Sequence, residues 1–250
     1  MNSQQEPSVT KGDLVSVVIP AHNEQTTLPR CLAALREQQS AREFEVIVVD
    51  SASTDRTQQV ARSFGARVIR LEEPGVGRAR QAGFEAARGE IILSTDADAV
   101  PSADWIERVI APFHDPEVIG AFGTIRFTRG GARARISHAL FSAFQGSNLY
   151  VGWPLFCGPN FAVRKDAFRA VGGFSTSAGY PTEGEDTRLG LKLNKIGKIV
   201  FLRDVPMAVS PRSFERGRGV SYVVHNAKVY FKLCWGGKGQ PAVAGWYQRK

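Results

Sequence analysis

The chain of 250 residues is 43% hydrophobic, which is enough to bury the core of one large domain or of two small ones. No stretch approaches the roughly 18 consecutive apolar residues of a membrane span, and the polar residues 1–13 contain no apolar region of a signal peptide. The three cysteines are widely separated, which excludes a disulfide framework and a C-x-x-C zinc site. The composition therefore predicts a cytoplasmic globular protein with free thiols.

The net charge of +8 is concentrated at the C-terminal end of the chain. Residues 201–250 hold nine Lys and Arg against two Asp and Glu. Such a segment favours an anionic partner, which could be nucleic acid, anionic lipid or an acidic substrate, although a solvated basic surface is an equally simple interpretation. Because the sequence shows no recognised nucleic-acid-binding module, we expect no nucleic-acid partner.

The first hundred residues alternate between strand and helix patterns. A leader over residues 1–13 is expected to be disordered. Pro20 is expected to stop the first strand, and Ser53 or Thr54 to cap the second helix. Short crossovers of this kind build a parallel, doubly wound sheet in which the loops after each strand gather at one edge. Strands are predicted at residues 14–19, 44–49, 66–71 and 90–94, with helical patterns that begin near Thr27, near residue 54 and after Gly75.

The fourth strand leads into the sequence STDADAVP, in which Asp96 and Asp98 are spaced one residue apart. Ligands of open α/β sheets bind at the carboxyl ends of the strands, where the topology also places Glu24 and Asp50. Hard carboxylate oxygens suit Mg²⁺ or Mn²⁺ that carries a diphosphate. A solvated Asp-rich turn or a helix cap is the alternative interpretation.

Beyond Pro101 the pattern is less regular, and no Pro/Gly-rich linker divides the chain. We therefore expect one domain with two functional halves, over about residues 14–101 and 102–212, followed by a basic helix and tail over residues 213–250. The predicted elements are a helix near residues 104–113, a strand at 118–127, a helix at 134–148, a pocket-like loop at 152–160, a strand at 161–163, a short helix before Gly172, a helix after Asp186, two short strands at 199–202 and 206–209, and a long helix at 220–235.

Two further motifs bear charged side chains in Gly-containing loops. In GVGRAR, Arg78 and Arg80 can bring guanidinium groups to a phosphate, or they can simply begin a helix. Glu183, Glu185 and Asp186 precede a helix, where the helix dipole favours acids, but a carboxylate beside a pocket can also act as a general base. The four histidines lack the spacing of a zinc site, and no G-x-S-x-G hydrolase motif occurs.

The order of six motifs resembles that of the family 2 inverting glycosyltransferases with the GT-A fold. The motifs are SVVIPAHNE, VIVVDSASTD, GVGRARQAG, STDADAVP, CGPNFAVRKDAFRAVGGF and GEDTRLGLKL, and the resemblance covers about residues 14–212. It implies an α/β fold with a Rossmann-like, doubly wound mixed sheet, helices on both faces and a single domain. It also implies transfer of a sugar from a nucleoside-diphosphate sugar, with Mn²⁺ or Mg²⁺ as cofactor.

The same resemblance assigns roles to individual residues. Asp186 would be the catalytic base. Asp98 would hold the metal most directly, and Asp96 would be a second ligand nearer the ribose. Around the donor nucleotide the resemblance places Pro20, Ala21, Glu24 and Asp50 at the base and ribose and Arg80 at the diphosphate, and on the acceptor side it places the loop with Gly158, Pro159 and Asn160, together with Glu185.

The chemistry of sugar transfer requires a base and a cation on opposite sides of the sugar. The acceptor hydroxyl loses a proton to Asp186 as it attacks, while the metal and Arg80 stabilise the leaving diphosphate, and one direct displacement inverts the anomeric centre. Many relatives place a metal-binding histidine where this chain reads Ser210-Pro211-Arg212, so we expect Arg212 to contact the diphosphate instead. The chain lacks the Q-x-x-R-W motif of processive synthases, which favours transfer of single sugars.

Two other functions stay open at this point. A sugar nucleotidyltransferase has a related fold, but it normally uses a Gly-rich basic loop after the first strand, where this chain reads PAHNE. A non-catalytic membrane-surface binding protein would use the basic segment at residues 212–235, whose predicted helix could lie on an anionic bilayer. For the enzyme, we expect a glycan or lipid-linked acceptor and, through the same segment, peripheral contact with the inner face of the membrane.

Overall fold

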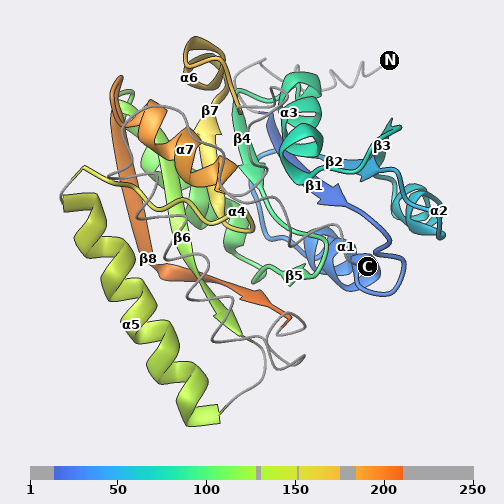
Figure 1. The fold of residues 1–250 in the computed structure, drawn as a ribbon, viewed down its shortest axis with the longest axis horizontal. Helices are drawn as coiled ribbons and strands as arrows, with labels where there is room; N and C mark the ends of the chain where they lie inside the picture. The colour runs from blue at the N-terminus through green and yellow to red at the C-terminus, as the bar shows by residue number, and fades with distance from the viewer. Residues whose placement is uncertain (1–13, 128–130, 151, 175–183, 211–250) are drawn as a thin grey trace, which may run out of the picture.

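The computed structural model describes residues 14–127, 131–150, 152–174 and 184–210. These residues form an eight-stranded mixed sheet in the order β3-β2-β1-β4-β7-β6-β8-β5, with helices on both faces (Figure 1). The strands are β1 (Val15–Ala21), β2 (Phe44–Ser51), β3 (Arg67–Leu71), β4 (Ile91–Ser94), β5 (Ala99–Val100), β6 (Val118–Phe127), β7 (Phe161–Arg164) and β8 (Lys198–Val209). The helices are α1 (Leu28–Arg36), α2 (Thr57–Ser63), α3 (Val76–Ala86), α4 (Trp105–Ile110), the 3₁₀ turn η1 (Ala111–His114), α5 (Gly131–Tyr150), α6 (Lys165–Ala170) and α7 (Glu185–Leu193).

The first four strands of the chain, β1 to β4, pair in parallel and form one half of the sheet. β1 lies between β2 and β4, and β3 pairs with the outer side of β2. Valine and isoleucine dominate these strands, as expected where both faces of a parallel sheet are covered. The predicted doubly wound arrangement is confirmed, and the carboxyl ends of β1, β2 and β4 meet at one edge of the sheet.

Pro20 lies inside β1, so the expectation that it ends the strand is wrong. β1 pairs with β4 only up to Val18 and Ser94, whereas its pairing with β2 continues to Ala21. The carbonyl of Val18 accepts a hydrogen bond from the N–H of Thr95, so Val18 directs its backbone groups to the β4 side. Pro20, two residues on, faces the same side, where β4 has already ended. Its missing N–H therefore removes no hydrogen bond from the ladder.

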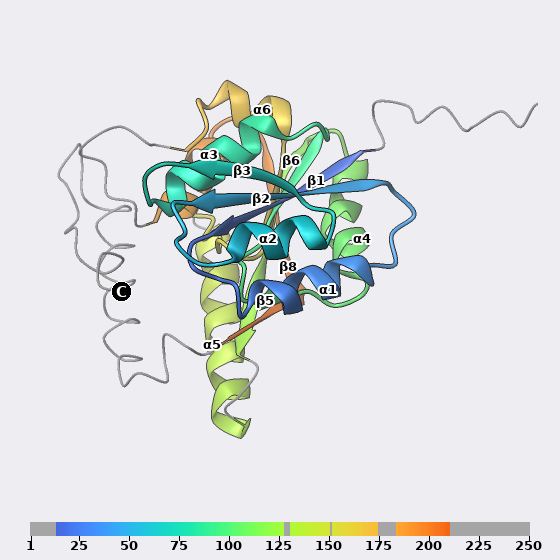
Figure 2. The same cartoon turned by 90° about the vertical axis from the view of Figure 1, so that its right-hand side faces the viewer.

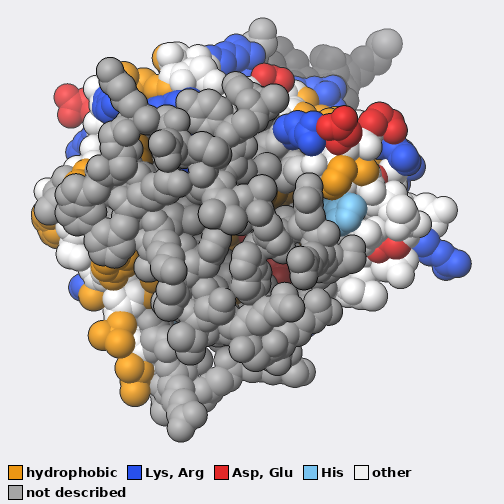
Figure 3. Space-filling model, in the orientation of Figure 1, with side chains coloured by type: hydrophobic (Ala, Val, Ile, Leu, Met, Phe, Trp, Pro, Cys, Tyr) orange, Lys and Arg blue, Asp and Glu red, His pale blue; other side chains and the backbone are white. Residues whose placement is uncertain are grey.

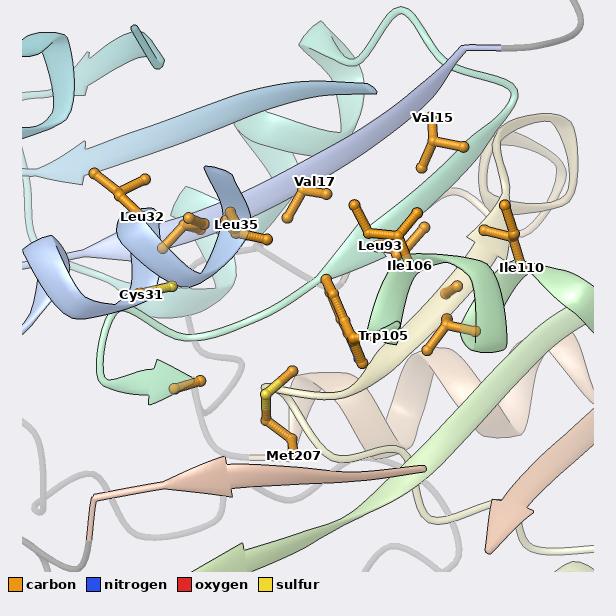
Figure 4. Packing of buried hydrophobic residues seen from close by; sticks show 14 of the residues in the cluster. Val15, Val17, Cys31, Leu32, Leu35, Leu93, Trp105, Ile106, Ile110 and Met207 are labelled. Atoms are coloured by element: carbon orange, nitrogen blue, oxygen red, sulfur yellow. The ribbon is translucent and has the colours of Figure 1, made fainter. Parts of the chain in front are cut away.

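Alternation along β1 divides the core into two layers. Val15, Val17 and Ile19 pack with α1 and α4, whereas Val18 packs with α3, α6 and α7 on the other face. Figure 2 shows the sheet between α1 and α2 on one side and α3 and α6 on the other. Figure 4 shows the first layer, where Trp105 lies among the side chains of α1, β1 and β4. Both layers hold the carboxyl edge of the parallel strands in a fixed position.

The second half of the sheet is mixed. β7 is antiparallel to both β4 and β6, β8 is parallel to β6, and the short β5 is antiparallel to β8. β8 is one strand where the sequence predicts two, because its register with β6 shifts between Leu202 and Met207. This irregularity contains Pro206, and bulges of this kind accommodate a residue that cannot donate to the ladder.

The cap of α2 and the length of α5 differ from the predictions, and the last predicted helix lies outside the described residues. Neither Ser53 nor Thr54 caps α2, which begins at Thr57, and the Oδ1 of Asp55 accepts the hydrogen bond of the Thr57 N–H at 2.9 Å. α5 is longer at both ends than the predicted range of 134–148. The leader, Glu183, Arg212 and the helix predicted at 220–235 lie outside the described residues. Within the described ranges, none of the helices combines the length and the apolar character that a membrane crossing requires.

Candidate active site

Asp96 and Asp98 lie in the turn between β4 and β5. The N–H of Ala99 donates to the carbonyl of Asp96 at 3.0 Å and closes this turn. Thr95, Ala97 and Ala99 are buried, whereas the two aspartates between them are partly exposed. This alternation directs both carboxylates away from the core, at the edge of the sheet where the parallel strands end.

Arg80 connects this turn to α7. Its side chain projects from α3 and is almost fully buried. Nη2 donates to Asp96 Oδ1 at 2.7 Å, and Nη1 donates to Glu185 Oε1 at the start of α7. The planar guanidinium suits this double role because its N–H groups form a rigid fork. Arg80 therefore fixes the position of the turn with Asp96 and Asp98 relative to the first turn of α7.

Gly158, in the loop before β7, contacts both Arg80 and Asp186. Its carbonyl accepts a hydrogen bond from Ser94 Oγ at 2.8 Å, and its N–H donates to the carboxylate of Asp186. A Cβ atom at this position would lie 2.2 Å from Arg80 Nη2, so a side chain here would displace the guanidinium. The absence of a side chain at Gly158 thus permits the close packing of the loop, α3 and α7.

Three carboxylates, Asp96, Glu185 and Asp186, surround the guanidinium of Arg80. Burial raises the pKa of Glu185 to about 7, against the opposing effect of Arg80. Burial also raises the pKa of Asp186, while Arg80 and the N–H groups of Thr187 and Gly158 oppose the rise. A partly buried carboxylate with a raised pKa is a better proton acceptor than one in water. Such a concentration of negative charge also attracts cations.

The loops after β1 and β2 are joined by a network of hydrogen bonds. Asn23, which adopts a positive φ of 54°, receives a bond at its carboxamide oxygen from Thr54 N (2.9 Å) and donates its own N–H to Ser53 Oγ (2.9 Å). The N–H of Gln25 donates to Asp55 Oδ2 at 3.1 Å. The network makes the two loops one rigid unit at the carboxyl edge of the sheet, beside Asp96.

The structure places the predicted donor-side residues at this edge but gives Asp50 a more internal position. Pro20 and Ala21 are buried at the end of β1, and Glu24 is partly exposed in the following loop. Asp50 is fully buried; its Oδ1 accepts from the N–H of Ser53 and its Oδ2 from Gln58 Nε2, at 3.3 and 2.6 Å. The Asp50 carboxylate thus shapes the loop after β2.

Two of the predicted acceptor-side residues have buried side chains that are bonded to other parts of the fold. Asn160 is fully buried, where its Nδ2 donates to the carbonyls of Thr124 and Val205 and its Oδ1 accepts from Trp105 Nε1. Its side chain therefore links α4, β6 and β8 and is not available to an acceptor. Glu185 is likewise buried, against Arg80. Gly158 remains at the site, and Pro159 is partly exposed beside it.

Gln145 of α5 is a site-related residue that the sequence reasoning missed. It is fully buried, and its Nε2 donates to the carbonyl of Leu155 at 3.0 Å and to Cys157 Sγ at 3.3 Å. These bonds hold the loop that leads to Gly158. The signal in the sequence is the polar series Ser142, Gln145 and Asn148, whose spacing of three places the side chains on one face of the helix.

The residues present fit a divalent metal that is shared with a diphosphate. Within the described residues no cluster of three or more His, Cys, Asp or Glu side chains could hold a metal alone. Mg²⁺ and similar hard cations need only one or two carboxylates when phosphate oxygens and waters complete their coordination. Asp96 and Asp98 supply such a pair of oxygen donors, close to the buried guanidinium of Arg80.

The family model described as "Glycosyl transferase family 2" matches residues 16–172. The chain belongs to this family, as the order of its motifs predicts. The match includes β1 to α6 and therefore contains the turn with Asp96 and Asp98, Arg80 and Gly158.

Similar proteins extend this result. Glycosyltransferase AglE from Haloferax volcanii is 31% identical over 168 residues, which is 64% of this chain and 55% of AglE. An undecaprenyl-phosphate 4-deoxy-4-formamido-L-arabinose transferase from Pseudomonas paraeruginosa is 37% identical over 109 residues, 39% of this chain and 32% of that protein. The chain thus spans about a third to about half the length of these curated relatives.

Solved structures share the fold. The mannosyltransferase PcManGT from Pyrobaculum calidifontis, in complex with GDP-Man and Mn²⁺, superposes with a TM-score of 0.68 at 24% identity, over 91% of this chain and 65% of that one. Glucosyl-3-phosphoglycerate synthase from Mycobacterium tuberculosis, in complex with Mn²⁺, UDP-glucose and phosphoglyceric acid, gives a TM-score of 0.60 at 21% identity, over 98% and 90% of the two chains. The predicted GT-A architecture is confirmed.

Proposed function

We propose that the chain transfers a single sugar from a nucleoside-diphosphate sugar to an acceptor hydroxyl with inversion, using a divalent metal and Asp186 as the general base. The observation that carries this proposal is the cluster in which Arg80 binds Asp96 on one side and Glu185 on the other, with Asp186 beside it. A donor-binding turn and a base are thereby held at a fixed separation. Family membership supports the class of reaction.

The donor nucleotide would lie along the carboxyl edge of β1, β2 and β4. In this proposal Pro20, Ala21, Glu24 and Asp50 form the wall around the base and ribose, with the joined loops as its rigid support. Arg80 would contact the diphosphate, as would Arg212, which lies outside the described residues. The complexes of PcManGT and of the glucosyl-3-phosphoglycerate synthase, which contain Mn²⁺ and a sugar nucleotide, support a similar donor and metal here.

Asp98, with Asp96, would hold Mn²⁺ or Mg²⁺. When bound, the cation would act as a Lewis acid that stabilises the charge developing on the leaving diphosphate. Arg80 adds a fixed positive charge on the same side, and its burial keeps that charge in a region of low dielectric, where it acts strongly. Glu185 keeps Arg80 in this orientation.

On the acceptor side, Asp186 would take the proton of the attacking hydroxyl. Its raised pKa favours this role, and the N–H of Gly158 orients the carboxylate. Attack from the side of Asp186, opposite the diphosphate, inverts the anomeric configuration. Gly158 and Pro159 would border the acceptor, for which we propose a glycan or a lipid-linked sugar; the name of the undecaprenyl-phosphate transferase supports the second.

The test is release of nucleoside diphosphate from UDP-, GDP- and dTDP-sugars with Mn²⁺, with and without added acceptors. Asp186→Asn should lower turnover by about 10²- to 10⁴-fold, because that is the usual contribution of a general base. Asp166→Asn is the matched control. Asp166 also lies in the first turn of a helix and accepts the N–H of the next residue at 2.7 Å, as Asp186 does.

Equal turnover in the wild type and in Asp186→Asn would refute the role of Asp186. Formation of pyrophosphate from a nucleoside triphosphate and a sugar phosphate would instead identify a nucleotidyltransferase.

A further inference from the structure

α5 has four large apolar side chains on the outside of the molecule. Ile136, Leu140, Phe144 and Tyr150 are 61, 68, 44 and 95% exposed, and they account for four of the five strongly exposed large hydrophobic side chains of the described residues. Spacings of 4, 4 and 6 residues place all four within one stripe of the helix surface. Figure 3 shows hydrophobic side chains gathered along the margin of the molecule where α5 lies in Figure 1. We call these four residues the α5 stripe.

The opposite face of α5 packs on the body of the molecule with both polar and apolar side chains. Ser142, Gln145 and Asn148 are at most 8% exposed, His138 Nδ1 lies 3.0 Å from the carbonyl of Ile125, and Leu149 packs against the core. A helix that packs on a sheet through one face normally has a polar outer face. The α5 stripe is therefore not the remainder of a core-facing surface, and exposed apolar patches of this kind mark interaction sites.

The charge around α5 indicates the kind of partner. Residues 118–165 contain no Asp or Glu, although the whole chain holds 24 in 250 residues. The same segment contains Arg126, Arg129, Arg133 and Arg135 before the stripe. Arg126 is exposed next to Ile125, to whose carbonyl α5 bonds. An apolar stripe in a sequence segment that contains arginines and neither Asp nor Glu complements an anionic lipid surface.

We propose that α5 docks on an anionic lipid bilayer through the α5 stripe. The helix has 20 residues and so is about 30 Å long, and Figure 2 shows it extending beyond the body of the sheet, where it can lie flat on a membrane. Tyr150 suits the boundary between headgroups and acyl chains, since its ring is apolar and its hydroxyl is polar. Gln145 and Asn148 on the inner face connect this surface to the loop before Gly158.

Flotation of the full chain with vesicles tests this docking. We expect binding to vesicles of phosphatidylcholine with 30% phosphatidylglycerol, at least tenfold weaker binding to pure phosphatidylcholine, and further weakening at high salt. The combined variant Ile136→Ser, Leu140→Ser and Tyr150→Ser should bind the anionic vesicles at least tenfold more weakly than the wild type. Ile196→Ser, at an exposed apolar position that is not part of α5, should bind as the wild type does.

Thermal unfolding and light scattering of all variants complete the test. A variant that unfolds like the wild type and has lost vesicle binding supports the docking surface. Unchanged binding of the triple variant would overturn it, and would place the contact in another part of the chain. Absence of vesicle binding by the wild type would also overturn it. A dimer of the wild type that the triple variant cannot form would overturn it too, and would identify another copy of the chain as the partner.

Discussion

Arg80 determines the arrangement of charges at the site because its guanidinium binds Asp96 and Glu185 at once while Gly158 packs against it. Two carboxylates and the close packing of Gly158 hold this buried guanidinium in place. Any side chain at Gly158 would displace the guanidinium, so the position of Arg80 depends on the glycine.

Gly158→Ala should therefore impair transfer more than folding. The added Cβ would lie 2.2 Å from Arg80 Nη2 and 2.8 Å from its Cζ, which forces the guanidinium to move. A displacement of about 1 Å typically costs about 100-fold in rate, so we expect kcat/KM to fall about 10- to 100-fold. The control is Gly77→Ala, whose Cβ would meet Glu185 Cγ at an ordinary 3.6 Å. Equal rates for the two variants would contradict the proposed role of Gly158.

Glu185→Gln should change how stability depends on pH. The pKa of Glu185 is about 7 in the folded chain, above its ordinary value of 4.5, so the folded state binds this proton more tightly than the unfolded state does. The wild type consequently loses stability as pH rises from about 4.5 to 7, and the neutral glutamine does not. We expect the unfolding free energy of the variant, relative to wild type, to rise by roughly 1 to 3 kcal/mol over this window.

Urea titrations of both proteins at pH 5, 6, 7 and 8 measure this difference. The change of this difference with pH is the informative quantity, because loss of the ion pair with Arg80 also lowers the unfolding free energy of the variant by an additional amount. If the stability of the variant relative to the wild type fell with rising pH, the pKa of Glu185 would be lowered in the folded chain. The attraction of Arg80 would then outweigh the effect of burial on that pKa.

Among single residues, the sequence predicted the positions that depend on a local pattern. Asp96 and Asp98 follow a strand, and Asp186 begins a helix. The ion pair of Arg80 with Glu185 was not predictable from local pattern, because 105 residues separate the partners. The buried side-chain contacts of Asn160 were not predictable for the same reason: its three hydrogen bonds reach α4, β6 and β8, which only the fold brings together.

Among the elements, α3 shows how closely a helix must pack on the sheet to position the site. Gly83 of α3 faces β1 and β2, where a Cβ would lie 2.3 Å from Val18 Cγ1 and 3.0 Å from Val49 Cγ2. Both valines are fully buried and have no room to move. The glycine thus sets the distance between the sheet and the helix that presents Arg80.

Gly83→Ala should destabilise the chain. Overpacking costs about 1–3 kcal/mol, and the helix propensity gained by replacing glycine with alanine returns at most about 1 kcal/mol. In a protein of this size each kcal/mol corresponds to about 2–4 °C in Tm. Thermal unfolding should show a lower Tm than that of Gly77→Ala, which gains propensity on the same helix without a clash. A Tm above that of the wild type would show that α3 can move away from the sheet.

Element prediction succeeded where periodicity was strong. The parallel half of the sheet and β6 lie close to their predicted ranges, because alternation of strands and helices is a local signal. β8 was predicted as two strands, since its bulge interrupts the pattern while its pairing with β6 continues on both sides. The inward polar stripe of α5 was also missed, because polar residues within an apolar helix do not reveal which face is buried.

In the whole molecule, the two halves of the sheet have different roles. The parallel half positions the loops after β1 and β2 and the turn with Asp96 and Asp98. The mixed half, with α7 and the loop before β7, places Asp186 and Gly158 opposite them. The order of the motifs sufficed to predict this architecture, because each parallel strand ends in a loop at the same edge. Arg80 links α7 to α3 through a tertiary contact that has no sequence signal, and apolar residues of both helices share one core cluster.

The central claim is that Asp98 and Asp96 hold a divalent metal that binds the diphosphate of a nucleotide donor. Isothermal titration of UDP and GDP into the wild type and into Asp98→Asn, with Mn²⁺ and again with EDTA, tests it most directly. For at least one nucleotide, wild-type affinity should rise at least tenfold with Mn²⁺, and the rise should disappear in Asp98→Asn. Equal affinity with Mn²⁺ and with EDTA, or no binding of either nucleotide, would contradict the claim.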